Sequence, residues 1–495
     1  MNRLILVLII IVLQPYKMFS QEASWSVRFD GRNKSEQYRK YDITSENNNL
    51  VLDFSKSARN REAIKFKLSY LEAPSASFSA FVWVKAARDV EQSAVILSNK
   101  KSSEDDGWEI RASENGAWSW QFYQNHKVVS QYNATAKRQA INDGKFHLIG
   151  LVYDYTKNQV WLYFDGTNVG IVNVGKGDLS RFLNLYLGGN GNDERYSFNG
   201  YIKSAHLFKD QVHNGRVVKL YQNNSKYSGE EGVNGYFYKN IKFLTWNISD
   251  GGKSHGELIG LDRTLEVIKD SKADIIALQE TNGSGEYLAD GLGYYFYSIS
   301  EKLSILSKFP IKRTVKLYTA DKSGGVEIAI SKNQYVYFFN ISLENTPDWS
   351  SFESGYSKNE YRVAESKKRG VDLKEMLEQI RVMIKPKSST SIVFSGELNS
   401  LSFADYDGGK YHYPVSNLLD KYNYVDSYRS LYQGGRLYPG YTCCTESKDK
   451  RQGRVDYIYY KGSKLQVKDS QVIKHHPIKF PSKHFGVLTE FSWKK

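Results

Sequence analysis

The spacing of apolar residues changes near residue 240, and this change limits the folds that the chain can adopt. Before it, short apolar runs separated by turn residues recur with almost no helical spacing. After it, apolar strands alternate with segments whose apolar residues recur at helical spacing. A chain of 495 residues is too long for one usual domain and long enough for two. The sequence therefore predicts two domains of different fold class.

The segment from about residue 25 to 225 has the pattern of an all-β sandwich. Turn signals such as Asp106-Gly107 and Asp165-Gly166 separate its short strands. The strands are predicted at 78–84, 95–97, 118–123, 146–153, 160–164 and 185–187. Tryptophans in such strands belong to the core more often than to a sugar-binding surface, so no sugar site is predicted.

This half resembles the concanavalin A-like, laminin G-like jellyroll family. The resemblance covers about 200 residues and rests on FSAFVWVKA, DGKFHLIGLVYD, VWLYFDGTNVG and YLGGN followed by FNGYIKSAHLF. It implies a jellyroll domain at 25–225 that binds a glycan or a surface protein and is not a catalyst. Some members hold calcium at the rim, but the aspartates here, among them Asp143 and Asp165, are most simply turn residues.

The segment 240–495 alternates strands and helices. Strands are predicted at IKFLTWN, DIIALQE, YVYFFNISL, SIVFS and VDYIYY, and amphipathic helices at 258–268 and 373–384. Apolar strands buried on both faces and joined by helices indicate an α/β sandwich. The polar, glycine-bearing residues 226–239 are predicted to be a linker.

Several strands of this half end in a polar residue that a core does not need. These residues are Asn247 after FLTW, Glu280 after IIALQ, Glu397 and Asn399 after IVFSG, Asp456 after GRV, and His484 before FGVLTEF. One such ending is an ordinary turn, but six favour strands that bring their ends to one site. There, acids and carboxamides can bind a hard cation and a histidine can handle a proton.

Eight motifs in order over about 250 residues resemble the endonuclease/exonuclease/phosphatase superfamily. They are FLTWNI, ADIIALQET, SILSKFPI, SGELNS, VDSYRS, YPGYT, GRVDYIYYKG and PSKHFGVLTEF. The resemblance implies a four-layer α/β sandwich that hydrolyses phosphoesters with a divalent cation, usually Mg²⁺, with Mn²⁺ or Ca²⁺ as alternatives. Glu280 would be the principal metal ligand, helped by Asn247.

The same resemblance implies the catalytic roles. Glu397 would orient the attacking water, Asn399 would bond to the phosphoryl oxygens, and His484 would be the general base. Asp456 would support this network, although a structural salt bridge with Arg454 or Arg429 is the alternative for that residue.

Three positions depart from the family pattern. Glu397 stands where the family has aspartate, and its extra methylene could displace a reacting water by about an ångström and cost on the order of a hundredfold in rate. Lys483 replaces the aspartate before His484, which predicts a lowered pKa for His484 and no acceptor to fix its tautomer. Ser342 replaces the family's second histidine.

Glu344, His475 and His476 are the candidates to replace the missing groups. Metal binding is expected to survive these departures better than proton transfer. Two readings therefore stay close: a phosphoesterase of reduced activity, and an inactive relative that binds a phosphorylated or polyanionic ligand. A carbohydrate-active enzyme has little support, because the jellyroll lacks paired carboxylates on adjacent strands.

The N-terminus and the charge bear on location and partners. Residues 1–20 read as a cleaved signal peptide with an apolar run of about ten residues, too short to span a bilayer. No later segment reads as a membrane helix, so we expect the exported chain to be soluble. We also expect it to be a monomer. The sequon at Asn247-Ile248-Ser249 suits a bacterial origin. The net charge of +14 is spread along the chain and fits a nucleic acid, an anionic lipid or simple solubility.

Two adjacent cysteines, Cys443 and Cys444, are the only ones in the chain. Neighbouring residues cannot form a disulfide of usual geometry without strain, so the sequence predicts no disulfide framework. The pair is predicted to act as small apolar side chains in a loop.

Overall fold

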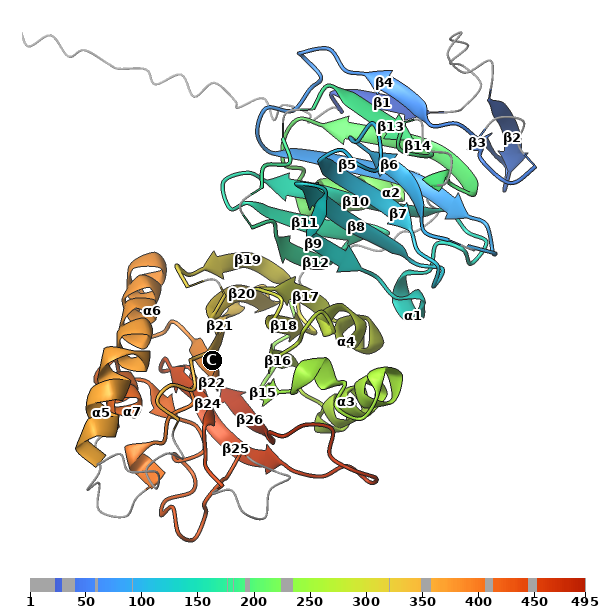
Figure 1. Cartoon of the computed structure of the whole chain (residues 1–495). Helices are drawn as coiled ribbons and strands as arrows, with labels where there is room; N and C mark the ends of the chain where they lie inside the picture. The colour runs from blue at the N-terminus through green and yellow to red at the C-terminus, as the bar shows by residue number, and fades with distance from the viewer. Residues whose placement is uncertain are drawn as a thin grey trace, which may run out of the picture.

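Three β-sheets, with helices on the outer faces of the second half, form the fold (Figure 1). The computed structural model describes residues 23–28, 41–57, 61–90, 92–175, 177–180, 182–191, 196–223, 235–319, 321–348, 358–405, 413–443 and 452–494. The predicted signal peptide at 1–20 and most of the predicted linker at 226–239 lie outside these residues.

The first half consists of two facing antiparallel sheets. One has the order β4-β13-β6-β7-β8-β9, with strands Ile64–Lys67, Asn184–Leu187, Ala94–Ser98, Gly107–Ala112, Trp118–Gln124 and Lys127–Asn133. The facing strands run β2-β3-β14-β5-β10-β11-β12, with bounds Asp42–Glu46, Asn49–Asp53, Gly200–Phe208, Phe78–Ala86, His147–Asp154, Gln159–Phe164 and Thr167–Asn173. Strand β1 (Trp25–Arg28) pairs with β14, and the short helices are α1 (Ala136–Gln139) and α2 (Asn214–Gln222).

The core between these sheets is aromatic. Phe78, Trp108, Trp118 and Trp120 are fully buried, and the Phe78 and Trp108 rings stack with centroids 5.7 Å apart. Burial of such side chains provides most of the stabilisation of a sandwich. The six strands predicted from the sequence of this half are all present. Trp83, Trp118 and Trp120 in these strands are buried as predicted, whereas Trp161 is only partly buried.

The second half also has two facing sheets. One has the order β17-β18-β16-β15-β26-β25, with strands Tyr295–Ser298, Leu303–Ser307, Ile275–Gln279, Asn240–Asn247, Gly486–Trp493 and Leu465–Ile473. The other has the order β19-β20-β21-β22-β24-β23, with strands Ile311–Lys316, Ser323–Ser331, Gln334–Ser342, Ile392–Glu397, Asp456–Lys461 and Val425–Asp426. Apolar side chains from both sheets, such as Phe243 and Phe338, meet in a shared core.

Helices cover the outer faces of these two sheets (Figure 1). On one side lie α3 (Glu257–Ser271) and α4 (Gly285–Leu292), and on the other lie α5 (Lys358–Lys367), α6 (Arg369–Ile384) and α7 (Pro414–Lys421). Leu373, Leu377 and Ile380 of α6 are buried against β21 and β22, which confirms the helical spacing predicted there. Two single 3-10 turns, η3 (Asp250–Gly252) and η5 (Phe403–Asp405), complete the elements.

The two halves share one sheet. Strand β12 of the first half pairs in parallel with β17 of the second, through Ile171 with Tyr297 and Val172 with Ser298, so that one sheet of 14 strands crosses both halves. Asn173 continues the junction by donating to the carbonyl of Ile299 at 2.7 Å. The first half is therefore fixed to the second by backbone pairing as well as by the connecting chain.

Asp290 of α4 is the buried polar centre of this junction. Its carboxylate accepts hydrogen bonds from the Thr135 amide at 2.8 Å, the Thr135 hydroxyl at 3.1 Å and the Gln139 side-chain amide at 2.7 Å. Gln139 is fully buried and Asp290 is 5% exposed. Burial raises the pKa of Asp290, and the donors from α1 oppose that rise.

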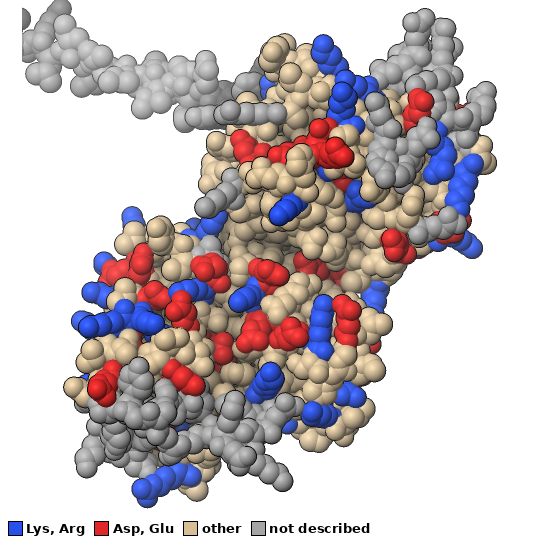
Figure 2. Space-filling model, viewed as in Figure 1, with Lys and Arg blue, Asp and Glu red and all other residues tan. Residues whose placement is uncertain are grey.

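Charged side chains of both signs are intermixed over the face shown in Figure 2. This agrees with the even spread of the net charge of +14 along the sequence. Among the helices that the structure describes, none has the length and apolar character needed to cross a bilayer.

Replacing Asp290 with alanine is expected to lower the free energy of unfolding by roughly 2–3 kcal/mol, because three donors at the junction lose a charged acceptor. The matched control is Asp262→Ala, since Asp262 also contacts the first half through Lys137 at 3.4 Å but is exposed. That substitution should cost less than about 1 kcal/mol. Calorimetric unfolding of both variants measures the difference, and equal effects would contradict a central role for Asp290.

Candidate active site

His484 and Asp456 form a buried hydrogen-bonded pair at one end of the second half. The imidazole Nδ1 lies 2.9 Å from Asp456 Oδ2, and the Asp456 side chain has no exposed surface. Asp456 is the first residue of β24, where Thr442 Oγ1 accepts hydrogen bonds from the Val455 and Asp456 amides. His484 lies just before β26, and Trp246 fixes this segment by donating from its indole to the His484 carbonyl at 2.9 Å.

Glu397 faces this pair from the neighbouring strand. It is the last residue of β22 and stands directly opposite Asp456 in the antiparallel register. Its Oε1 lies 3.7 Å from His484 Nε2, so the imidazole lies between two carboxylates. One ligand atom from each of the three side chains lies within 4.8 Å of the other two, a spacing that can hold a metal ion.

Gly396 sets the position of Glu397. Its φ is 140°, and a Cβ built on it would lie 1.8 Å from the Ile341 carbonyl oxygen. A side chain at this residue would force β22 away from β21 and move Glu397 with it. The glycine of the SGELNS motif therefore serves the close approach of two central strands.

Ser342 has taken the place of the histidine expected at the end of β21. It pairs with Glu397 in the parallel register of β21 and β22, and its hydroxyl donates to Glu397 Oε2 at 3.2 Å. From the sequence, Ser342 is expected only to lack the family's second imidazole, and this hydrogen bond is not predicted. Adjacent strand ends in parallel register were the signal that could have revealed it.

Glu280 and Asn247 lie together at the ends of β16 and β15, which pair in parallel. The Asn247 amide nitrogen donates to Glu280 Oε1 at 2.9 Å, and the Asp250 backbone amide donates to Glu280 Oε2 at 3.2 Å. Asn247 Oδ1 accepts from the Ser249 amide. The oxygen of Asn247 is therefore engaged by the backbone, and its nitrogen orients the Glu280 carboxylate.

Two of the predicted residues adopt left-handed backbone conformations. Glu280 has φ of 55° and Asn399 has φ of 50°. Non-glycine residues in this region cost of order 1–3 kcal/mol and are retained where the surroundings require them. Asn399 is 6% exposed and donates one side-chain hydrogen to the Leu343 carbonyl at 2.8 Å, which leaves its second hydrogen for another acceptor.

The charges of the site shift both ionisable groups that face each other. Burial raises the pKa of Glu397 to about 7, with His484 opposing the rise and the Asp456 and Glu280 carboxylates adding to it. Burial lowers the pKa of His484, but Asp456, Glu397 and Glu280 outweigh burial and raise it to about 9. Glu280 is thus close enough to act on both groups.

The prediction that Lys483 lowers the pKa of His484 is wrong. Lys483 is exposed, and the acceptor that fixes the imidazole is Asp456. The family pattern places that acceptor directly before His484 in the chain, whereas the fold supplies it from a strand 28 residues away.

The candidate replacements for the missing groups are engaged elsewhere. Glu344 pairs with Lys322 at 2.7 Å and His476 pairs with Glu266 at 3.0 Å. His475 is exposed. None of the three joins the cluster of Glu397, Asp456 and His484.

Arg454 and Arg429 do not pair with Asp456. Arg454 forms ion pairs with Asp405 and Asp426, and Arg429 with Asp405. The alternative of a structural salt bridge for Asp456 is therefore not what the structure has.

Cys443 differs from its predicted state. It forms isolated β-bridges with Gly453 and His484, beside the Thr442 that supports Asp456. The sequence predicts a small apolar side chain and no disulfide framework, but Cys443 is disulfide-bonded. Cys444 lies outside the described residues.

Comparison with known families assigns both halves of the chain. The family model of the concanavalin A-like lectin/glucanases superfamily matches residues 60–231, and that of the endonuclease/exonuclease/phosphatase family matches residues 244–358. The chain carries a concanavalin A-like domain followed by an endonuclease/exonuclease/phosphatase domain. Both resemblances seen in the sequence are confirmed. The second match includes Asn247, Glu280 and Ser342 and ends before Glu397.

Several solved structures match the chain at low sequence identity. No curated protein sequence matches the chain. The solved structure of TDP2 from Caenorhabditis elegans is 18% identical with a TM-score of 0.38, over 57% of this chain and 85% of that one. An endonuclease/exonuclease/phosphatase family protein from Bacteroides thetaiotaomicron is 14% identical with a TM-score of 0.39, over 52% and 100%. An AP endonuclease from Archaeoglobus fulgidus is 15% identical with a TM-score of 0.37, over 50% and 98%.

The substitution Asp456→Asn is expected to lower the pKa of His484 from about 9 to its usual 6.5 or below, since burial remains and the main opposing charge is gone. Titration of metal-free protein carrying ¹³C-labelled histidine measures this by NMR. The matched control is Lys483→Gln, which removes the charge next to His484 in sequence and should change its pKa by less than about half a unit. A larger effect of Lys483 than of Asp456 would contradict the pairing.

The thermal stability of metal-free protein should fall as pH rises from about 5 to about 9. Both Glu397 and His484 bind a proton more tightly in the fold, at about 7 and about 9, than at their ordinary 4.5 and 6.5. A group with a raised pKa stabilises fully below its ordinary value and loses that contribution as pH passes its folded value. Calorimetry in chelator, beside a Glu397→Gln, His484→Gln double variant, isolates these groups. An unchanged slope in the double variant would contradict the assignment.

Proposed function

We propose that the second domain hydrolyses a phosphoester with the help of a divalent cation. The observation that carries the proposal is the convergence of Glu280, Glu397, Asp456 and His484, from separate strands, on one end of the two sheets. Four such groups repel or attract one another strongly, and a core would be more stable without them. Their retention indicates chemistry, and the matching family supplies its class.

The donor set fits a hard cation such as Mg²⁺, Mn²⁺ or Ca²⁺. Asp456 Oδ1 is a buried carboxylate oxygen without a hydrogen-bond partner among the described residues, and Glu397 is destabilised by neighbouring carboxylates. Oxygen donors of this kind suit these ions. We propose that Glu280 is the principal ligand, oriented by Asn247, and that Asp456 completes the protein's share. The cation, when bound, neutralises charge on the phosphoryl and leaving oxygens.

The roles of Glu397 and His484 follow from their protonation. With a pKa of about 9, His484 carries a proton at neutral pH, so it suits the stabilisation of a phosphoryl oxygen better than the predicted role of general base. Glu397, with a pKa of about 7, is the group able to take a proton from the attacking water as the water oxygen bonds to phosphorus. Asp456 holds the imidazole, and the free side-chain hydrogen of Asn399 bonds to a phosphoryl oxygen.

We also propose the layer arrangement, the domain boundary, the location and the substrate class. The two sheets and flanking helices of the second half form a four-layer α/β sandwich, and the domains divide at residues 226–239. The jellyroll binds a glycan or a surface protein, and the protein is exported as a monomer. The substrate is a phosphoester of a nucleic acid, a phospholipid or a smaller molecule, in keeping with the net charge of +14.

A second candidate is a protein that binds a phosphorylated ligand without cleaving it. The observation in its favour is that Ser342 stands where the family has a histidine, and its hydroxyl donates a hydrogen bond to Glu397. A buried hydrogen bond to Glu397 stabilises the charged form but cannot supply a second imidazole.

Hydrolysis can be tested with bis(p-nitrophenyl) phosphate, plasmid DNA, RNA and sphingomyelin, each with Mg²⁺, Mn²⁺ or Ca²⁺. Glu280→Gln, Asn399→Ala and His484→Ala should each lower kcat/KM by about 10²–10⁴-fold, because each removes charge stabilisation or positioning at the phosphoryl group. The matched control is Glu344→Gln, an exposed carboxylate just beyond β21, which should change the rate less than about twofold.

Two outcomes would contradict the proposed hydrolysis. One is a rate that Glu344→Gln lowers as much as Glu280→Gln does. The other is Mn²⁺ binding that depends on Glu280 without turnover of any substrate, which would support the binding protein instead.

A further inference from the structure

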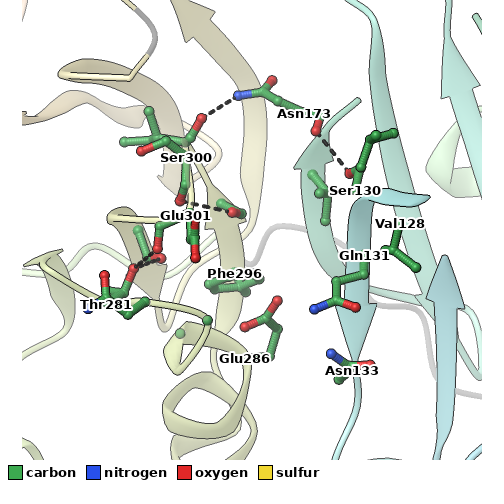
Figure 3. Close-up of a pocket in the computed structure, with 18 residues that line it drawn as sticks. Val128, Ser130, Gln131, Asn133, Asn173, Thr281, Glu286, Phe296, Ser300 and Glu301 are labelled. Carbon is green, nitrogen blue, oxygen red and sulfur yellow. Dashed lines mark hydrogen bonds between the residues drawn. The ribbon is translucent and has the colours of Figure 1, made fainter. Parts of the chain in front are cut away.

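A pocket of about 420 Å³ lies where the two domains meet (Figure 3). One wall comes from β9 and β12 of the first domain, with Ser130, Gln131 and Asn133. The other comes from the loop after β16, the start of α4 and the segment after β17, with Thr281 and Glu286. The volume suits a small organic molecule.

The lining of this pocket is polar and acidic. Its polar side chains are hydroxyls, carboxamides and the carboxylates of Glu286 and Glu301, and no lysine or arginine is among the lining residues that the structure describes. The whole chain has 68 Lys and Arg against 54 Asp and Glu, so basic residues dominate elsewhere. A pocket without cations in a basic protein attracts a cationic group.

Glu286 is the buried member of this lining. Its side chain points into the gap toward Gln131 and Asn133 on the opposite wall (Figure 3), and Glu286 is only 9% exposed. Within the described residues, its own backbone amide is the donor that bonds to its carboxyl, and no Lys, Arg or His forms an ion pair with it. Burial raises the pKa of Glu286 to about 7, with a small addition from Asp290.

A carboxyl in this setting is costly unless something pairs with it. An ionised, buried carboxylate without a partner destabilises a fold by several kcal/mol, and a glutamine of the same shape would avoid that cost. Asp290, one helical turn further along α4, shows the contrast because it has three donors from the first domain. Among the described residues no cation pairs with Glu286, so a cation from outside them would stabilise its charged form.

We propose that this pocket binds a small hydroxylated primary amine, whose ammonium group pairs with Glu286 while its hydroxyl groups bond to Gln131 and Asn133 and donate to Ser130. A primary ammonium offers three donors to the carboxylate and the nearby amide oxygens. The exposed carboxamides of Gln131 and Asn133 both donate and accept, as hydroxyl groups of a ligand require, whereas the Ser130 and Thr281 hydroxyls already donate to the carbonyls of Asn173 and Glu301. The proposal does not depend on phosphoester hydrolysis.

Calorimetric titration at pH 7.5 with glucosamine and with ethanolamine tests the proposal. Each has a neutral counterpart of similar shape, N-acetylglucosamine and ethylene glycol. At least one amine should bind at least tenfold more tightly than its neutral counterpart, a difference of about 1.4 kcal/mol. Equal affinities for amine and neutral counterpart, or no binding of either amine at millimolar concentration, would overturn the proposal.

Variants locate the site. Glu286→Gln should weaken amine binding at least tenfold, whereas the matched control Glu301→Gln, an exposed carboxylate of the same lining, should change it less than about twofold. Should Glu286→Gln fail to fold, Gln131→Lys serves in its place, since Gln131 is exposed and a lysine there carries its own ammonium toward Glu286. Amine binding that survives the folded Glu286 variant, or that survives Gln131→Lys, would overturn the proposal.

Discussion

Two carboxylates side by side in the interior set the chemistry of the second domain. The register of β22 and β24 holds Glu397 opposite Asp456, and both are nearly inaccessible to water. Like charges this close cannot both remain ionised without compensation. The proton on His484 supplies one positive charge and the proposed cation a second. Burial is the main cause of the raised pKa of Glu397, and the facing Asp456 carboxylate adds to it. For His484, the Asp456 and Glu397 carboxylates outweigh burial and raise the pKa.

Much of this site could be predicted because polar residues at the ends of apolar strands are conspicuous. The apolar runs make it easy to notice the polar residues beside them, namely Glu280, Glu397 and His484. Parallel strands bring the strands' carboxyl ends to one edge of the sheet. The partner of His484 could not be found in this way. A hydrogen bond between residues 28 positions apart depends on which strands become neighbours, and local sequence carries no information on that order. Lys483 is next to His484 in the sequence, but adjacency in sequence does not show that one side chain acts on the other.

The domain junction was harder still to foresee. The fold class of each half follows from its apolar spacing, but nothing in the sequence of β12 or β17 marks them as partners across the boundary. Asp290 reads as an ordinary polar residue of an amphipathic helix until Thr135 and Gln139 of α1 are seen to converge on it. Because the two domains share a sheet and a buried carboxylate at their junction, the jellyroll is fixed to the second domain. It is not a freely tethered module.

The interdomain pocket and the candidate metal site are adjacent in the sequence. Thr281 lines the pocket and follows Glu280 directly, and Glu280 has a left-handed backbone that its neighbours must maintain. The Thr281 hydroxyl donates to the Glu301 carbonyl and its amide bonds to Lys302, so the pocket wall and the support of Glu280 are one short segment. A ligand that orders this wall restricts the same backbone that aims the Glu280 carboxylate. The first domain thereby bears on the backbone at Glu280, although none of its described residues belongs to the cluster of Glu397, Asp456 and His484.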